Sequence, residues 1–306
     1  MAEKLFFGID GGGTYSRIAL INEKNEIISS AEAGSTNIYS VSIEEACGNI
    51  AILLDSALQN AGLVINDIAS GCMGSAGLGR EDDLAVYRGF FVKLFGGKFP
   101  VKLCSDAEIL LCGGLRETEG YCLIAGTGSI AMGRSKTGEI VRAGGHGYLL
   151  GDEGGAAWTG RIAVSRILRS LENRDLKTGM LDAILKRAGL GSSDELVKYI
   201  NITADKAKTA ALAPVVSEAA ESGDELALDI INKGADELAL LVKSVRERSL
   251  QIRNQKIILA GGAIENDHLL RENVTKAIKK YCPDMEITLP QGTALEGACL
   301  LALNQR

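Results

Sequence analysis

Two glycine-rich segments in the sequence end in hydroxyl side chains, and each follows a short apolar run. Asp10 to Thr14 comes directly after residues 5–9, and Gly126 to Ser129 comes directly after residues 121–125. Glycine lets backbone amides approach phosphate oxygens, and a hydroxyl adds another donor. One such segment is commonly only a tight turn, but two matched segments predict phosphate binding. The residues concerned are Gly12, Gly13, Thr14, Gly126, Thr127, Gly128 and Ser129.

Two aspartates stand where apolar runs end. Asp10 lies inside the first glycine segment, where a carboxylate can hold Mg²⁺, directly or through water, or can satisfy the amides of its own turn. Asp106 follows the run 101–104 and precedes a helical pattern. There it could accept the proton of a hydroxyl that attacks a γ-phosphate. An N-cap aspartate has the same context, so the residues alone leave both roles open.

The segment from Ala143 to Trp158 combines several glycines with His146, Asp152 and Glu153, just ahead of a helical pattern. Carboxylates at the start of a helix face its positive dipole end, and glycines let the backbone approach a ligand. Helix capping is the competing role for both carboxylates. Trp158, the only tryptophan, is interpreted as a core residue.

The elements that position these residues follow from hydrophobic periodicity and turn residues. We predict that the first three strands form an antiparallel meander and that a second meander begins after residue 120. Two further strands each precede a glycine or hydroxyl turn. Predicted strands cover 5–9, 17–22, 26–31, 68–73, 101–104, 121–125, 130–133, 139–143, 256–259 and 286–289. Predicted helices cover 43–61, 81–95, 107 onward, 156–171, 267–281 and 293–303, and 207–248 is predicted to be helical.

Every glycine or hydroxyl turn, including Ser75 to Gly77 and Gly261-Gly262, lies at the carboxyl end of a predicted strand. Ligands of open α/β sheets bind at that edge. The two matched segments also form a weak internal repeat, which suggests two copies of one sheet topology. The GxxxxGK[ST] pattern of a P-loop is absent, and the first glycine segment leads into a strand, unlike a dinucleotide-binding fingerprint.

Length, charge and cysteine content argue against several classes of protein. The chain has 306 residues, enough for two domains, with a formal charge of −6 and no basic run that would attract nucleic acid. Its seven cysteines are scattered and form no CxxC pair, which is typical of reduced thiols. The N-terminus does not read as a signal peptide and no apolar run is long enough for a membrane span. We therefore expect a cytoplasmic protein.

Six motifs carry a resemblance to a known family. GIDGGGTYSR, STN, CSDAEI, IAGTGS, GGHGYLLGDEG and ILAGG occur in this order over nearly the whole chain. Together they resemble the BadF/BadG/BcrA/BcrD ATPase family and, within it, the N-acetylglucosamine kinase-like branch. The resemblance implies a two-domain actin-like (ribonuclease H-like) α/β fold, with ATP and sugar in the interdomain cleft. It implies domains 1–117 and 118–292, with the C-terminal helix (293–306) packed on the first.

The resemblance also implies roles for individual residues. Thr14 and Thr127 match nucleotide-phosphate contacts, and Asp106 matches the catalytic base. Asp10, from its place in the first glycine segment, is expected to hold Mg²⁺ through water. Gly261, Gly262 and Ala210 match positions near the nucleotide. Sugar-binding positions are Asn37, Ser75, Asp106, Gly145, His146 and Asp152. The family often carries tryptophan where this chain has His146, so the sugar pocket is expected to differ there.

The expected function is an ATP-dependent sugar kinase that transfers phosphate to an amino sugar, at the 6-OH. Candidate sugars are N-acetylglucosamine, glucosamine and N-acetylmuramic acid. The expected ligands are ATP, Mg²⁺ and a small sugar; a homodimer stays open. The alternative is an ATPase activator of a radical dehydratase or reductase that carries an iron–sulfur cluster on cysteines. Cys104 and Cys122 fall in apolar strands and Cys112 in a helix, which argues against that alternative.

Overall fold

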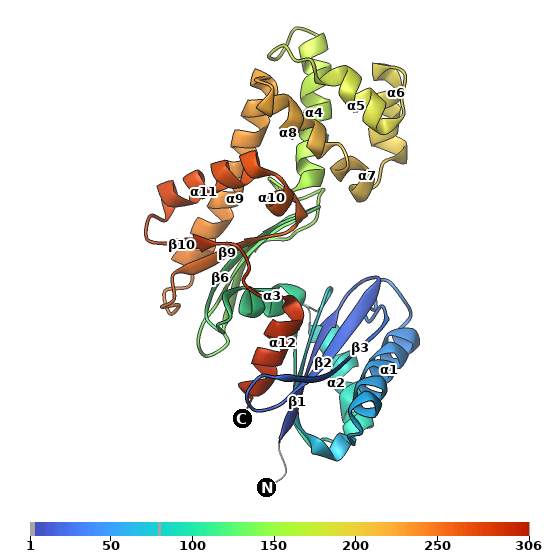
Figure 1. Cartoon of the computed structure of the whole chain (residues 1–306). Coiled ribbons are helices and arrows are strands. Elements are labelled where there is room, and N and C mark those ends of the chain that lie inside the picture. The colour runs from blue at the N-terminus through green and yellow to red at the C-terminus, as the bar shows by residue number, and fades with distance from the viewer. Residues whose placement is uncertain (1–3, 79–80, 306) are drawn as a thin grey trace. The chain divides into compact units, whose positions relative to one another are not determined.

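The computed structural model describes residues 4–78 and 81–305, and the chain forms two compact units (Figure 1). Unit 1 comprises the described residues up to Gly120 together with those from Pro290 onward, and unit 2 comprises Tyr121–Leu289. That the predicted divisions at 117/118 and 292/293 bound independently folding domains stays a prediction.

Unit 1 contains a five-stranded sheet in the order β3-β2-β1-β4-β5. The first three strands pair antiparallel, which confirms the predicted meander, whereas β4 pairs parallel with both β1 and β5. The strands are β1 (Leu5–Gly11), β2 (Tyr15–Ile21), β3 (Ile27–Gly34), β4 (Ile68–Ser75) and β5 (Val101–Ser105). Because β1, β4 and β5 are parallel, their carboxyl ends, and the polar residues that follow them, share one edge.

Two layers of helices cover this sheet. The helices are α1 (Ile43–Ala61), α2 (Glu81–Phe95), α3 (Asp106–Leu115) and α12 (Ala294–Leu303), with a 3₁₀ turn, η1 (Ile65–Asp67). Phe7 and Ile9 of β1 enter an apolar core with residues of α1 and α2, including a stacked pair of Phe7 and Phe91 rings. The alternate residue Gly8 faces α12, where a Cβ would lie 2.5 Å from the backbone nitrogen of Cys299. This alternation places α3 and α12 on the opposite face from α1 and α2.

The contact between α3 and α12 depends on glycine. A Cβ on Gly297 would lie 1.8 Å from the carbonyl oxygen of Ile109, and a Cβ on Gly113 would lie 1.8 Å from that of Thr293. No side chain fits at either position, so the two helix backbones touch directly. Figure 1 shows α12 lying against α3, although the two are far apart in the sequence. The helix that begins at Asp106 is therefore held by residues near the other end of the chain.

Unit 2 repeats the sheet of unit 1. Its order is β10-β9-β6-β7-β8; β9 pairs parallel with β6 and β10, and β7 pairs antiparallel with β8. The strands are β6 (Gly120–Ala125), β7 (Ser129–Arg134), β8 (Ile140–Gly144), β9 (Lys256–Ala260) and β10 (Glu286–Thr288). Reading β6 as the counterpart of β1 and β9 as that of β4 gives the same topology twice. The predicted internal repeat is confirmed.

The helices of unit 2 pack with its sheet around a large apolar core. They are α4 (Ala156–Leu171), α5 (Met180–Ala188), α6 (Ser193–Lys198), α7 (Lys206–Ala210), α8 (Ala213–Glu221), α9 (Glu225–Glu247), α10 (Gly262–Asn266) and α11 (His268–Tyr281), with a π-helical turn, η2 (Tyr199–Thr203). The region 207–248 is helical as predicted, but in separate helices. Pro214 stands in the first turn of α8, and Gly223 has φ of 89° between α8 and α9. Helices α5 and α6 were not predicted.

Candidate active site

The first glycine turn connects β1 to β2 at the carboxyl edge of the unit 1 sheet. Its base is fixed by the carbonyl oxygen of Gly11, which accepts from the Ala76 amide at 3.1 Å and from the Ser75 hydroxyl at 3.0 Å. Gly13 and Thr14 at its tip are exposed. The turn is therefore held at its base while its tip, with a hydroxyl and free backbone, faces solvent.

Asp10 ends the apolar part of β1 and is largely buried, with 18% of its side chain exposed. Its Oδ2 accepts from Arg17 of the neighbouring strand at 2.8 Å. Among the described residues, no hydrogen bond to Oδ1 is found. One carboxylate oxygen thus remains for a water molecule of a hydrated Mg²⁺, which fits the predicted outer-sphere role, since magnesium retains several waters when it binds proteins.

Asp106 is the first residue of α3, directly after β5. Ser105 caps the helix by accepting from the Glu108 amide at 3.2 Å, so Asp106 is not the N-cap residue. Its Oδ1 accepts from the Ala107 amide, and no lysine or arginine of the described chain pairs with it. Solvent reaches the side chain, yet the surrounding protein removes part of its hydration. This desolvation, with the charge of Asp10 adding to it, raises the pKa of Asp106.

The other unit 1 residues assigned to the sugar lie near the same edge of the sheet. The Oδ1 atom of Asn37 accepts from the Tyr39 amide at 2.9 Å, and the side chain is half-buried. Ser75 is fully buried, and its hydroxyl donates to the carbonyl oxygen of Gly11. Its side chain thus supports the first glycine turn. A sugar contact at this position would have to come from the backbone that continues into Ala76 and Gly77.

The second glycine turn connects β6 to β7 in unit 2 and is fixed by the start of α4. The amides of Ala156 and Ala157 donate to the carbonyl oxygens of Gly126 and Thr127 at 2.9 and 3.0 Å. The Ser129 hydroxyl, a predicted phosphate ligand, donates to the Glu153 carbonyl oxygen at 2.7 Å. Its proton is therefore already engaged in a hydrogen bond within the protein. Thr127 is exposed. The threonine hydroxyl, together with the backbone of the turn, is what remains accessible to a ligand.

Asp152 lies directly behind this turn. It is 3% exposed, has φ of 61°, and its Oδ2 accepts from Lys206 Nζ at 2.8 Å. A Cβ on Gly128 would lie 2.3 Å from the same carboxylate oxygen, so only glycine fits there. Lys206 was not among the predicted site residues. Because it follows Asp152 by 54 positions, no local sequence pattern could have linked the two.

The glycine segment that connects β8 to α4 carries His146 at its surface. Gly144, Gly145 and Gly147 all have positive φ, between 69° and 89°. His146 and Gly145 are exposed, and Gly144 and Gly147 are partly buried. The segment therefore presents an imidazole on a backbone whose shape depends on glycine.

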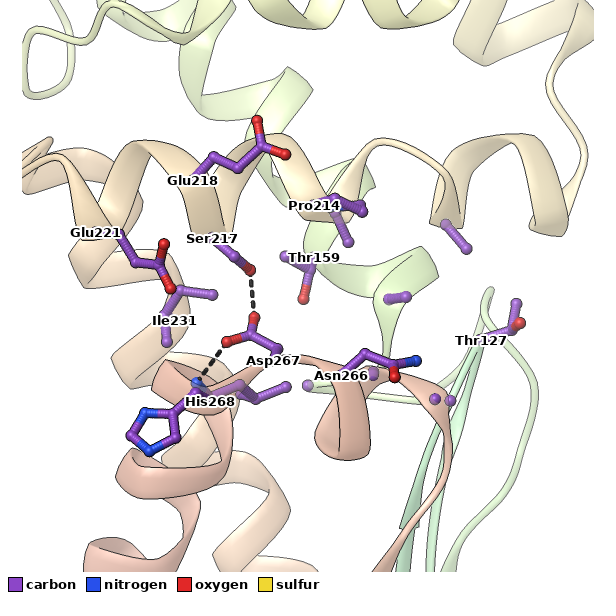
Figure 2. A pocket seen from close by; sticks show the side chains of 18 residues that line it. Thr127, Thr159, Pro214, Ser217, Glu218, Glu221, Ile231, Asn266, Asp267 and His268 are labelled. Carbon is purple, nitrogen blue, oxygen red and sulfur yellow. Dashed lines mark hydrogen bonds between the residues drawn. The ribbon is translucent and has the colours of Figure 1, made fainter.

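Unit 2 also contains a cavity of about 730 Å³ next to the second glycine turn. Gly126, Thr127, Ala210 and Gly262 belong to its lining, and Figure 2 shows Thr127 at one side of it. Ser217 and Asp267, which sequence reasoning did not single out, form a hydrogen bond in its wall. The structure thus gathers four residues assigned to the nucleotide, from three parts of the chain, around one space of the size that small-molecule sites have.

The burial of the cysteines, the arrangement of possible metal ligands and the character of the helices bear on other kinds of site. Cys72, Cys104, Cys112, Cys122, Cys282 and Cys299 are buried, and only Cys47 is partly exposed. Within the described ranges, no group of three or more histidine, cysteine or acidic side chains is arranged to hold a metal ion. No described helix has both the length and the apolar character needed to cross a membrane.

Comparison with known proteins identifies a family and several sugar kinases to which this chain is similar. The family profile of the BadF/BadG/BcrA/BcrD ATPases matches residues 7–302. An N-acetylmuramic acid/N-acetylglucosamine kinase of Clostridium acetobutylicum is 32% identical over 99% of both chains. An N-acetyl-D-glucosamine kinase of Dictyostelium discoideum is 28% identical over the full length of both. A crystal structure from Chromobacterium violaceum, of a protein proposed to be an N-acetylglucosamine kinase, is 25% identical with a TM-score of 0.72, and the similarity covers 99% of this chain and 100% of that one.

The two sheets of repeated topology and the likeness to these solved structures define an actin-like α/β fold of the sugar-kinase type. The chain belongs to the BadF/BadG/BcrA/BcrD ATPase family. ATP use follows from that membership at the level of the family.

Proposed function

We propose that this protein is an ATP-dependent sugar kinase that transfers the γ-phosphoryl group of ATP to the 6-OH of an amino sugar. The observation that carries this proposal is Asp106, a carboxylate at the carboxyl edge of the unit 1 sheet, with no basic partner in the described chain and a raised pKa. A general base must be ionised, reachable by substrate and close in pKa to the working pH. The names of the curated relatives, which are kinases of hexosamines, support the substrate class.

In the proposed reaction, Asp106 accepts the proton of the sugar hydroxyl as its oxygen attacks the γ-phosphorus. Asn37, Gly145, His146 and Asp152 are proposed to bind the sugar, together with the backbone at Ser75. Phosphoryl transfer depends mainly on positioning and on stabilising charge that spreads over the phosphate oxygens. Holding the hydroxyl in place is therefore as important as removing its proton.

The nucleotide is proposed to occupy the cavity of unit 2. The exposed Thr127 hydroxyl and the backbone of Gly126 and Gly128 would contact the phosphates there, while Ser129 holds the turn from inside. Gly261, Gly262 and Ala210 would lie beside the adenosine, and Gly12, Gly13 and Thr14 form the second, exposed phosphate turn in unit 1. Mg²⁺ would be held through water by Asp10 and would neutralise phosphate charge.

The test is coupled detection of ADP over a panel of amino sugars and plain hexoses, with and without Mg²⁺. N-acetylglucosamine, glucosamine and N-acetylmuramic acid are the first sugars to assay, and the phosphorylated position is read from the product by NMR. We expect sugar-dependent and Mg²⁺-dependent ADP release, with hexosamines preferred over glucose. If no sugar in the panel raises ADP release above background, the proposal is wrong.

A further inference from the structure

The two side chains of the ion pair behind the second glycine turn differ strongly in their exposure to solvent. The Asp152 side chain is 3% exposed, whereas that of Lys206 is 39% exposed. An ammonium has three N–H donors, and Asp152 takes one of them. Among the described residues, no other acceptor for Lys206 Nζ is found. Two donors on the accessible side of this lysine are therefore available to a ligand.

Lys206 also lies against the backbone of the turn. A Cβ built on Gly128 would come within 2.9 Å of Lys206 Nζ. The ammonium thus contacts the turn at Gly128, which has no side chain, next to the exposed Thr127. Ala210, at the other end of the same short helix, lines the cavity. Lys206 accordingly stands where the glycine turn meets the cavity.

The charges around the cavity fix which end can receive phosphate. Its described lining contains no lysine or arginine, and Glu218, Glu221 and Asp267 all belong to it. Figure 2 shows Glu221 on the opposite side from Thr127. A polyphosphate near those carboxylates would be repelled, so it must lie at the Thr127 end. There Lys206 brings positive charge to a chain whose formal charge is −6.

We infer that Lys206, which is paired with Asp152 beside Gly128, binds the polyphosphate of ATP. The inference rests on the proposed function, because it takes ATP as the occupant of the cavity. The lysine has two roles in this arrangement: it neutralises the buried Asp152 carboxylate, and it donates to phosphate oxygens at the mouth of the turn. Lysine commonly binds phosphate as a point charge, and hydrogen bonds between ionised groups are stronger than neutral ones.

The experiment compares nucleotides that differ only in phosphate. Titration calorimetry without sugar gives the Kd of the full-length protein for MgATP and for adenosine. In Lys206→Gln, we expect MgATP to bind about 10- to 100-fold more weakly, as for loss of a hydrogen bond to a charged group, while adenosine binds as before. Lys206→Arg should restore most of the MgATP affinity. Lys208→Gln, an exposed change on the same helix, should alter neither Kd.

A second pair of variants guards against misfolding, because Lys206→Gln leaves Asp152 buried without its partner. Asp152→Asn retains the lysine and should bind MgATP at least as tightly as wild type, since the ammonium is freed. Asp152→Asn with Lys206→Gln removes both charges, and should again bind MgATP about 10- to 100-fold more weakly than Asp152→Asn alone. Equal MgATP affinity of these two variants would overturn the inference, as would parallel losses for adenosine and MgATP.

The same titrations separate this inference from the proposed function. Wild-type protein that binds neither MgATP nor adenosine overturns both. Wild-type protein that binds MgATP but phosphorylates no sugar overturns the proposed function alone, and the Lys206 variants then still decide the inference through their MgATP affinity.

Discussion

Asp10, in β1, and Asp106, directly after β5, show how two carboxylates at the same edge of one sheet acquire different environments. Asp10 is paired with Arg17 at 2.8 Å, whereas Asp106 bonds only backbone amides in the described chain. The paired carboxylate has a guanidinium partner in the neighbouring strand β2. The other is partly desolvated and carries a raised pKa. The sequence left Asp106 open between helix cap and base; Ser105 is the N-cap, and the role of Asp106 as the base stays a proposal.

Replacement of Asp106 by asparagine tests the catalytic assignment. Asparagine keeps the shape and a hydrogen-bond acceptor but cannot take a proton, so kcat should fall by about 10²- to 10⁴-fold while MgATP still binds. Steady-state kinetics and titration calorimetry measure the two effects. Asp152→Asn, at a proposed sugar contact, should raise KM more than it lowers kcat. A correctly folded Asp106→Asn enzyme with near-normal kcat would contradict the assignment.

The raised pKa of Asp106 predicts the acid side of the pH profile. The base works only when ionised, so kcat/KM should decline as pH falls through its raised pKa. The midpoint should lie above about 3.9, the ordinary value for aspartate. MgATP affinity, measured at each pH, separates titration of the nucleotide from that of the base. A flat profile down to about pH 4, in protein that remains folded, would argue against Asp106 as the base.

His146 tests the sugar pocket. Its imidazole is exposed, and His146→Trp exchanges this polar ring for a larger apolar one. We expect the ratio of kcat/KM among N-acetylglucosamine, glucosamine and N-acetylmuramic acid to shift by the equivalent of about 1–3 kcal/mol, the range for one pocket contact. Unchanged ratios for all three sugars would show that this side chain does not contact the sugar.

Among the elements, α3 and α12 have the most stringent packing. Gly297→Ala places a Cβ 1.8 Å from the Ile109 carbonyl oxygen, so the two backbones must separate. We expect a loss of about 1–3 kcal/mol in the free energy of unfolding, as for other overpacked contacts, measured by urea denaturation. Gly48→Ala is the matched control. It also lies inside a helix, but nothing is within 4 Å of its added Cβ, so stability should stay the same or increase.

How far the sequence predicts these elements depends on whether the determining contacts are local. The strands and the glycine turns follow from short apolar runs and turn residues, and the structure confirms them. Helices α5 and α6 are short, and the sequence pattern around them was not recognised as helical. The Asp152–Lys206 pair joins a loop to a distant helix, and the Gly113 and Gly297 contacts join two helices that are far apart in the sequence. Contacts of this kind leave no periodic signal, so they appear only in the structure.

At the scale of the whole molecule, MgATP and the sugar should protect different parts of the two units from hydrogen exchange. Hydrogen exchange with MgATP alone should slow mainly in peptides of unit 2 that contain Gly126–Ser129 and α8, because the cavity lies there. Addition of a sugar substrate should extend protection to unit 1 peptides containing Asn37 and Asp106, and to those with Gly145 and His146 in unit 2. Protection by sugar confined to one unit would contradict the proposed set of sugar contacts.

The glycine contact between α3 and α12 also orders events during synthesis on the ribosome. All of unit 2, with its cavity, is translated before α12, whereas α3 has no α12 to pack against until residues 294–303 have emerged. A nascent chain halted after residue 289 could thus complete the unit that holds the cavity while the helix carrying Asp106 still lacked its support. On the proposed ligand assignment, the nucleotide site would be completed during biogenesis before the support of the helix that carries the proposed base.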